Sequence, residues 1–338
     1  MSIPKVKLLS FLAPWMRQYL AFRADLGYSV TARDFYLFRD LDYYVLWKGL
    51  SRMEQLDECF VANWVFVMPS HSTGTKNTRL TFLRCFCRYL VRLGLLKDNP
   101  AQRVRRLRQR KFRPYIYTVH ELASLLKEAD KWKQQCPAVS FAPWVMETLV
   151  HLIYACGLRI SEALNLKIKD IDFTESTLSL WKTKFHKERL VPFSLEIRNR
   201  LQTYLAERAT RFPDLCSPGD FVFCHRRGKY AYENIHHMFR HNLLLPSGLI
   251  RPRGPRIHDL RHTFAVHRLY KWYQEGCDVM NKLPLLSTYM GHVGIESTQV
   301  YLTIALSLLR EGSRRFKEHS ENLPRALLRR VLGKDGTR

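Results

Sequence analysis

Between residues 257 and 301 the chain repeats three kinds of side chain that suit chemistry on a phosphate ester: arginine, histidine and tyrosine. The residues concerned are His258, Arg261, His262, His292 and Tyr301. Arginine presents a planar fork of N–H donors that matches phosphate oxygens, and it stays charged at any working pH. Histidine exchanges a proton near neutral pH, and a tyrosine hydroxyl attacks phosphorus once its proton is removed. The set is suited to phosphoryl transfer without a metal, provided that the fold brings its members together.

Each of these residues, taken alone, is also consistent with an ordinary surface position. His258, Arg261 and His262 fall within about one helical turn, so they could form a solvated helix face. A single motif match is a weak hypothesis. The functional prediction therefore depends on further stretches upstream that supply matching residues.

The charge of the chain points to a polyanionic partner. Its 338 residues include 55 Lys and Arg against 30 Asp and Glu, a formal net charge of +25. Such an excess repels itself in a compact protein unless a polyanion neutralises it, and nucleic acid is the natural candidate. An acidic membrane would require a basic amphipathic helix or a lipidation signal, and neither is obvious. The length predicts two domains, and the 46% apolar content suffices for real cores.

Nothing in the sequence predicts export or a bound metal. The residues around Pro4 and Lys5 do not precede the apolar core of a secretory signal, and no apolar run is long enough to span a bilayer. The eight cysteines are scattered without a Cys-x-x-Cys pair, which is typical of reduced packing residues. A zinc site built on Cys224, His237 and His241 is the metal alternative, but we predict neither metal nor cofactor. We expect a cytoplasmic, nucleoid-associated protein of bacterial type.

The first part of the chain predicts four helices, each ended by a glycine or proline. Their expected ranges are Phe11–Leu26, about 31–47, about Leu56–Met68 and about Thr75–Leu93. The fourth helix combines an apolar face with a basic face that carries Lys76, Arg79 and Arg84. We predict that these three residues contact DNA, the alternative being an ordinary solvated surface.

A basic run follows Asn99-Pro100, from Arg103 to Arg113. Like charges at this density resist compact packing, so we predict an extended linker. Opposite DNA phosphates the same charges become attractive, and release of counterions adds to the binding. The residues predicted to contact DNA here are Arg105, Arg106, Arg108 and Lys111.

The second domain is expected to begin at Thr118, where Thr118 and Glu121 form a capping box. A helix is predicted from Pro143 to Cys156, and Gly157 ends it. Arg159 then lies at a helix junction, beside backbone donors that also favour anions. The alternative for Arg159 is a surface arginine held in a salt bridge.

Three short strands are predicted next, over 168–173, 177–181 and 188–193. The turn between the last two carries Lys182, Lys184 and Lys187, and an exposed hairpin tip can bring a lysine into a substrate groove. Spacing alone does not choose among the three lysines. Further helices are expected over 199–208 and 232–245, with a long connection from Lys271 to Pro284.

Three motifs together carry a resemblance to a known family. Gly157-Leu158-Arg159-Ile160-Ser161-Glu162, His258-x-x-Arg261-His262, and Gly291-His292 followed by Tyr301 resemble, in order and spacing, the tyrosine recombinase (phage integrase) family. The segment Lys184-Phe185-His186-Lys187-Glu188-Arg189 is similar to the family's hairpin, which favours Lys184 among the three lysines. The segment from Leu285 to His292 is most similar to the corresponding segment of recombinases carried by mobile elements.

The resemblance implies a mainly α fold with a small β-sheet, arranged as a C-shaped DNA clamp. It implies an N-terminal helical core-binding (SAM-like) domain over 1–102, a basic linker over 103–116, an α+β catalytic domain over 117–319 and a C-terminal tail over 320–338. The implied partners are double-stranded DNA recognition sites and further protomers, four on two sites or an assembly with sister recombinases. The amphipathic segment from Leu323 to Leu332 is a candidate for contacts between protomers.

The resemblance also implies the catalytic set: Arg159, Lys184, His258, Arg261, His292 and Tyr301. Tyr301 would attack a DNA phosphodiester and form a 3′-phosphotyrosyl link, without ATP or metal. Two arginines would hold the non-bridging oxygens, Lys184 would protonate the departing oxygen, and His258 would move the tyrosine proton. Neighbouring cations are expected to favour the phenolate of Tyr301.

Several rival functions remain open at this point. The main alternatives to a mobile-element recombinase are resolution of chromosome or plasmid dimers and relaxation of supercoils by a type IB topoisomerase. A DNA-binding regulator that has lost the chemistry would not need the complete polar set. A packaging protein would account for the charge but not for the spaced arginines, histidines and tyrosine.

Overall fold

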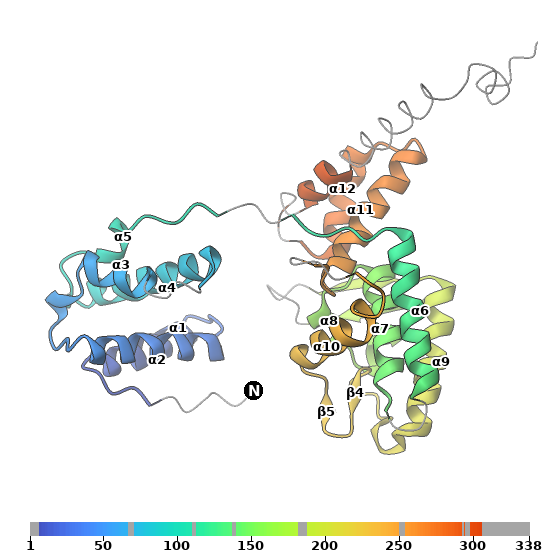
Figure 1. Cartoon of the computed structure of the whole chain (residues 1–338), viewed down its shortest axis with the longest axis horizontal. Coiled ribbons are helices and arrows are strands. Elements are labelled where there is room, and N and C mark those ends of the chain that lie inside the picture. Colours follow the sequence, from blue (N-terminus) through green and yellow to red (C-terminus); the bar gives the residue numbers. More distant parts are fainter. Residues whose placement is uncertain are drawn as a thin grey trace, which may run out of the picture. The chain divides into compact units, whose positions relative to one another are not determined.

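The computed structural model describes residues 7–66, 71–109, 113–136, 140–181, 188–249, 254–292, 294 and 298–305. The chain divides into two compact units, Met1–Phe112 and Arg113–Arg338, and each is described by itself (Figure 1). Both units are mainly helical, and the described part of the second also contains two small antiparallel sheets. The predicted fold class, mainly α with a small β-sheet, is confirmed.

The N-terminal unit is built from helices that match the predicted ones to within a few residues. They are α1 Ala13–Asp25, α2 Ala32–Trp47, α3 Glu58–Phe66, α4 Thr73–Arg92 and the short α5 Pro100–Arg103, with a 3-10 turn at Met53–Gln55. An aromatic cluster fills the core: Phe38 packs edge-to-face against Tyr19, Phe82 and Phe86, with ring centroids 4.6 to 5.9 Å apart. These long apolar faces explain why the periodicity predicted the helices well.

Two arginines of α4 that were predicted to contact DNA are held by groups of their own unit. Arg79 is 4% exposed; its guanidinium lies 4.0 Å from the centroid of the Trp64 ring, donates to the Trp64 carbonyl and pairs with Asp40. Arg84 donates to the carbonyls of Ala101 and Val104 at 2.9 and 2.6 Å. Both guanidinium groups satisfy acceptors within their own unit, and their contact with DNA stays a prediction.

The start of the basic run is held against α4. Asn77 and the backbone of Leu107 exchange two hydrogen bonds, at 2.8 and 2.9 Å, and Arg106 donates to the Thr81 hydroxyl. Arg105, Arg106 and Arg108 are nevertheless exposed, and Lys76 is half-buried. Lys111 lies outside the described residues. Residues 104–107, predicted as part of an extended linker, are therefore held against α4 by hydrogen bonds, with their arginines exposed.

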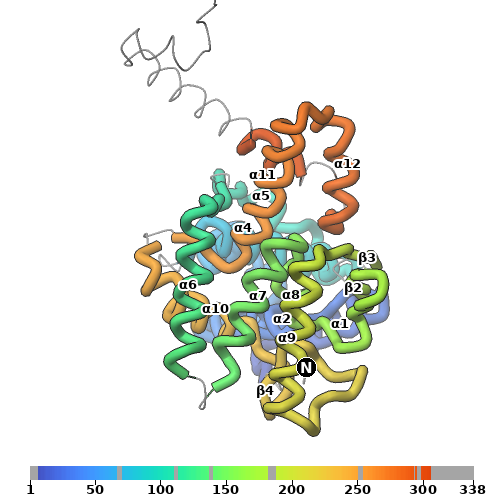
Figure 2. The backbone as a smooth tube through the Cα atoms, turned by 90° about the vertical axis from the view of Figure 1, so that its right-hand side faces the viewer, coloured from blue at the N-terminus to red at the C-terminus, as the bar shows by residue number. Residues whose placement is uncertain are grey.

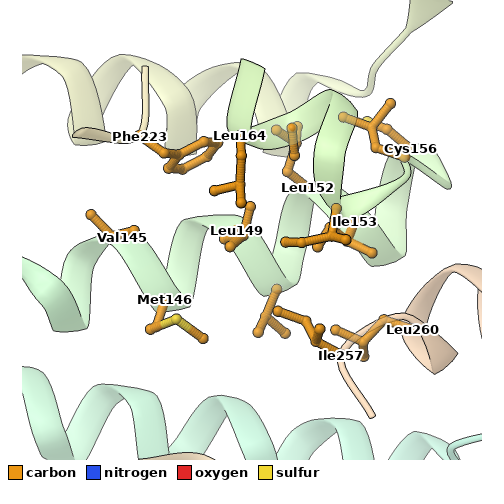
Figure 3. Close-up of a cluster of buried hydrophobic side chains, with 14 of the residues drawn as sticks. Val145, Met146, Leu149, Leu152, Ile153, Cys156, Leu164, Phe223, Ile257 and Leu260 are labelled. Atoms are coloured by element: carbon orange, nitrogen blue, oxygen red, sulfur yellow. The ribbon is translucent and has the colours of Figure 1, made fainter. Parts of the chain in front are cut away.

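Helix α7 is the centre of the second unit. The helices of this unit are α6 Val119–Gln135, α7 Ala142–Cys156, α8 Ile160–Asn165, α9 Leu195–Arg211, α10 Tyr232–Met238 with a π-helical turn at Phe239–Leu244, α11 Asp259–Gln274 and α12 Val279–Met290; residues 298–305 are also helical. Figure 3 shows side chains on opposite sides of α7 packing toward Phe223 and Leu164 on one side and toward Ile257 and Leu260 on the other. Because α7 is apolar nearly all round, it is buried on nearly all sides.

The predicted strands are present but shorter. Strands β1 Ile171–Asp172, β2 Thr177–Leu180 and β3 Arg189–Pro192 form an antiparallel sheet in that order, and a second pair joins β4 Cys224–His225 to β5 Gly228–Lys229. Figure 2 shows β2 and β3 side by side. In the register of this pair, Leu180 lies opposite Arg189. The hairpin tip, residues 182–187 with Lys184, lies outside the described residues.

The region from Lys271 to Pro284 is not one long connection as predicted. Helix α11 runs on to Gln274, and α12 begins at Val279 behind Asp278, whose carboxylate accepts from two backbone N–H groups of the first turn. Pro284 lies inside α12. A proline in a helix interior costs about 3 kcal/mol, so the sequence favours a break there. The C-terminal tail lies outside the described residues, and among those described no helix is long and apolar enough to cross a bilayer.

Candidate active site

The junction between α7 and α8 places Arg159. Gly157 ends α7 in the left-handed region, with φ of 60°, and a Cβ at this position would lie 2.5 Å from the Phe264 ring of α11. Only glycine therefore allows the chain to turn this close to α11. Arg159 follows as the N-cap residue of α8, and its guanidinium donates to Glu162 at 2.6 Å and to the Gly291 carbonyl at 2.6 Å.

Arg261 reaches the same place from α11. The residue is 1% exposed, and its guanidinium donates to the carbonyls of Gly157 and Met290 at 2.6 and 2.5 Å. It also lies 3.7 Å from the Glu162 carboxylate. Arg159 and Arg261 thus bind neighbouring carbonyls at the end of α12 and share one carboxylate, so the two guanidinium groups that the sequence paired do converge.

Tyr301 lies beside this arginine pair. It is 4% exposed, and its hydroxyl lies 2.7 Å from Nδ1 of His262. The His258 ring packs edge-on against His262 with centroids 4.9 Å apart. His292 stacks on Tyr301 with centroids 6.1 Å apart, and its Nδ1 lies 2.7 Å from the Thr298 hydroxyl. One imidazole therefore contacts the phenol oxygen, a second stacks on the phenol ring, and the charges of Arg261 and Arg159 act on Tyr301.

A pattern characteristic of one protein family covers this site. The phage integrase family matches residues 116–306, which is more than half of the chain and includes each polar residue described above. The chain belongs to the phage integrase family. Its members are the site-specific tyrosine recombinases that the three sequence motifs resemble, so that resemblance is confirmed.

Named relatives and solved structures agree with this assignment. A protein named as an integrase/recombinase, y4rB of Sinorhizobium fredii, is 34% identical over 259 residues, which are 75% of this chain and 80% of that one. Tyrosine recombinase XerC of Bacillus subtilis is 29% identical over 73% of this chain and 77% of its own. The fold is similar to XerH bound to difH DNA (TM-score 0.62, 20% identity, 83% and 78% coverage) and to the Tn1549 transposon integrase with circular-intermediate DNA (TM-score 0.62, 16% identity, 87% and 95% coverage).

Burial sets the protonation states in the recombinase site. Together with the charge of Arg261, it lowers the pKa of His258 and His262 to about 4 and that of His292 to about 3. The imidazoles are therefore neutral at neutral pH. Burial raises the pKa of Tyr301, although Arg261 and Arg159 oppose it. Arg261 and Arg159 favour the phenolate as expected, but desolvation outweighs them, so the phenol must lose its proton during the reaction.

A buried carboxylate that the sequence analysis did not single out holds the site together. Glu162 accepts from Arg159 and, through both oxygens, from Arg189 of β3 at 3.0 and 2.8 Å. Arg189 also donates to the Tyr289 carbonyl, so it ties the hairpin to α12. Gly291 is needed here because a Cβ would lie 2.7 Å from the Arg189 guanidinium. Glu162 thus neutralises part of the charge of three arginines.

Glu162 gives the recombinase a specific dependence of stability on pH. Burial alone would raise the pKa of Glu162, but hydrogen bonds and charges from Arg189, Arg159 and Arg261 lower it from 4.5 to about 2. A depressed carboxyl pKa contributes stability above pH 4.5 that is lost as pH falls toward 2. We expect the free energy of unfolding to fall by about 2 kcal/mol between pH 6 and pH 3 through this group. Urea unfolding of wild type and Glu162→Gln checks this, and an equal pH slope in both would contradict it.

The structure brings together five of the six predicted catalytic residues: Arg159, His258, Arg261, His292 and Tyr301. The sixth, Lys184, lies outside the described residues. Three further residues, Glu162, Arg189 and His262, contact the site although no role was predicted for them. Each stands within or beside a quoted motif, and that position was the available signal. Within the described part of the chain, no three acidic, histidine or cysteine side chains gather as metal ligands would.

Proposed function

We propose that this recombinase cuts one DNA strand with Tyr301, holds the strand end as a 3′-phosphotyrosyl ester, and passes it to the 5′-hydroxyl of another strand. The observation that carries the proposal is the position of the buried Tyr301 hydroxyl, which lies beside neutral imidazoles and two converging guanidinium groups. A phenol needs a proton acceptor to attack, and a phosphate in the transition state needs donors on its oxygens.

Each proposed role follows from the chemistry of its side chain. The phenol O–H bond and the bond from phosphorus to the 5′-oxygen break, while a bond from phosphorus to the Tyr301 oxygen forms. Arg159 and Arg261 hold the two non-bridging oxygens, and His292 donates to one of them. Lys184 protonates the leaving 5′-oxygen, and a histidine takes the phenol proton, a role for which the sequence favoured His258. The ester retains the energy of the broken bond, so rejoining needs no external energy source.

The biological role that we propose is transposition or integration of a mobile element. It is supported by the Leu285–His292 segment and by the similarity to a protein named as an integrase/recombinase. Resolution of chromosome or plasmid dimers is the alternative, because XerC proteins are also among the relatives. The solved structures with a similar fold include recombinases bound to DNA, which supports double-stranded DNA as the partner here.

We further propose that the domain organisation is that implied by the family: a core-binding domain over 1–102, a linker over 103–116, a catalytic domain over 117–319 and a tail over 320–338. The two domains would clamp DNA, and four protomers would assemble on two sites. The exposed arginines of the linker support this proposal, because a strip of cations outside any core is available to phosphates.

Binding should therefore weaken steeply with salt, and the linker arginines should account for part of the slope. Replacing Arg105, Arg106 and Arg108 with glutamine is expected to reduce the slope of log affinity against log salt by about 3, roughly 0.9 for each lost phosphate contact. Fluorescence anisotropy between low and moderate salt measures this slope. Arg103→Gln is the matched control, because Arg103 is exposed but paired with Asp98. An unchanged slope in the triple variant would remove the linker from the DNA interface.

A two-site exchange assay tests the proposed function as a whole. Plasmids that carry paired recognition sites, taken from the ends of a candidate element, are incubated with the protein, and recombinants and topoisomers are separated on gels. Recombinants together with a covalent protein–DNA band are the expected result. Relaxed topoisomers without recombinants would instead support a type IB topoisomerase, and binding without cleavage would support a regulator.

A further inference from the structure

We infer that His262, rather than His258, is the residue that takes the proton from Tyr301 during strand cleavage and returns it during rejoining. This inference deepens the proposed function and rests on it. The structure carries it through one contact: Nδ1 of His262 lies 2.7 Å from the Tyr301 hydroxyl, within hydrogen-bond reach of the reacting atom.

The helix geometry explains why His262 is the one in contact. His258 and His262 are four residues apart at the start of α11, so they share a face, and their rings meet edge-on. Of the two, it is His262 whose ring nitrogen lies within hydrogen-bond distance of the Tyr301 hydroxyl. His292, the third imidazole, stacks on the Tyr301 ring and directs its Nδ1 to Thr298. His262 is thus placed for the phenol proton, whereas His292 has a hydroxyl partner of its own.

The surroundings of His262 keep its imidazole neutral before cleavage. Burial keeps the imidazole neutral, so it can present an unprotonated nitrogen to the phenol, whose own pKa is raised. His258, Arg261 and Arg256 oppose a lasting positive charge on His262, and the buried carboxylate of Asp259 favours one.

The step balances without a further reactant. The Tyr301 O–H bond breaks and its proton moves to Nδ1 of His262, while the phenol oxygen bonds to phosphorus. The bond from phosphorus to the 5′-oxygen breaks, and that oxygen receives a proton from the general acid, for which Lys184 is proposed. In rejoining, the attacking 5′-hydroxyl gives up its proton, the phenolate leaves, and imidazolium at His262 returns the proton to Tyr301.

Two substitutions at His262 distinguish a hydrogen bond to the Tyr301 hydroxyl from removal of its proton. In His262→Asn the amide oxygen takes roughly the place of Nδ1 and still accepts a hydrogen bond, but it cannot become protonated. His262→Phe removes both functions. Single-turnover cleavage of a nicked site at saturating DNA is expected to fall on the order of 10²–10⁴-fold in both variants. A matched control stands on the same helix: His267 also directs Nδ1 to a tyrosine hydroxyl, that of Tyr154 at 3.0 Å, and His267→Asn should cleave at close to the wild-type rate.

Two chemical changes identify the proton concerned. Incorporating 3-fluorotyrosine at position 301 makes the phenol more acidic, so it should recover part of the cleavage lost in His262→Asn and change the wild-type rate much less. A substrate with sulfur at the 5′-bridging position has a leaving group that needs no protonation. This substrate should restore cleavage by Lys184→Ala but not by His262→Asn. Because each comparison uses one variant against itself, a partial folding defect in that variant cancels.

The outcomes distinguish this inference from the function on which it rests. Wild-type cleavage by His262→Asn, or its recovery by the sulfur substrate but not by fluorotyrosine, would overturn the role of His262 and leave the proposed function standing. If fluorotyrosine recovers His258→Asn instead, the proton goes to His258 as the sequence suggested. A covalent complex formed by Tyr301→Phe would overturn the proposed function itself.

Discussion

Replacing Tyr301 with phenylalanine is expected to abolish the covalent protein–DNA complex while leaving DNA binding and folding intact. The phenyl ring keeps the packing of Tyr301 in its buried cluster, so the lost hydrogen bond should cost only about 1 kcal/mol of stability. Loss of a nucleophile typically costs a rate factor on the order of 10⁶. The measurement is denaturing electrophoresis of the protein after incubation with a labelled, nicked recognition site, alongside a gel-shift titration.

Tyr289→Phe is the matched control for that experiment. Tyr289 is the other tyrosine near the site; its ring stacks on Phe264 and its hydroxyl donates to the Pro192 carbonyl at 3.2 Å. Its role is therefore packing, and the variant should retain the covalent band. If Tyr301→Phe forms the covalent band and Tyr289→Phe does not, Tyr289 rather than Tyr301 is the nucleophile.

Removing Arg261 should damage both the chemistry and the fold. Arg261→Gln withdraws a buried charge from Glu162 and leaves the Gly157 and Met290 carbonyls without their donor. We expect about 3 kcal/mol of destabilisation and a fall in cleavage on the order of 10²–10³-fold. Thermal unfolding and single-turnover cleavage, both measured below the melting temperature of the variant, separate the two effects.

Arg261→Lys shows which part of the effect is chemical. Lysine keeps the charge beside Glu162 but cannot reproduce the fork of donors, so stability should recover more than cleavage does. Burial lowers the pKa of Arg261 to about 9, so the native guanidinium is still charged at neutral pH. Arg268→Gln is the control: Arg268 is exposed on the same helix, over the Phe264 ring at 5.9 Å, and its loss should change neither quantity. Cleavage by Arg261→Lys at the wild-type rate would mean that charge alone matters.

The sequence predicted those parts of the fold that depend on local pattern. The four N-terminal helices, the strands around the hairpin and the end of α7 at Gly157 all follow from periodicity and from glycine signals. The same patterns did not show which basic residues of α4 face inward. Arg79 stands in the periodic positions of a basic face, yet it is buried because Trp64 and Asp40, distant in sequence, accept its guanidinium.

The sequence predicted which residues belong to the site but not how they contact one another. Motif spacing selected Arg159, Arg261 and Tyr301 because residue types and order carry that information. The contact between His262 and Tyr301, and the sharing of Glu162 among three arginines, depend on how α8, α11 and β3 pack, which no local pattern records. The net shift in the pKa of Tyr301 could not be predicted for a related reason: nearby cations can be expected from a sequence, whereas the degree of desolvation depends on the whole packed unit.

The most direct measurement is identification of the protein atom that becomes joined to DNA. The covalent complex is trapped on a nicked site, both components are digested, and the modified peptide is sequenced by mass spectrometry. The peptide should carry its nucleotide on Tyr301, linked through the 3′-phosphate. A nucleotide on any other residue, or a linkage through the 5′-phosphate, would contradict the account.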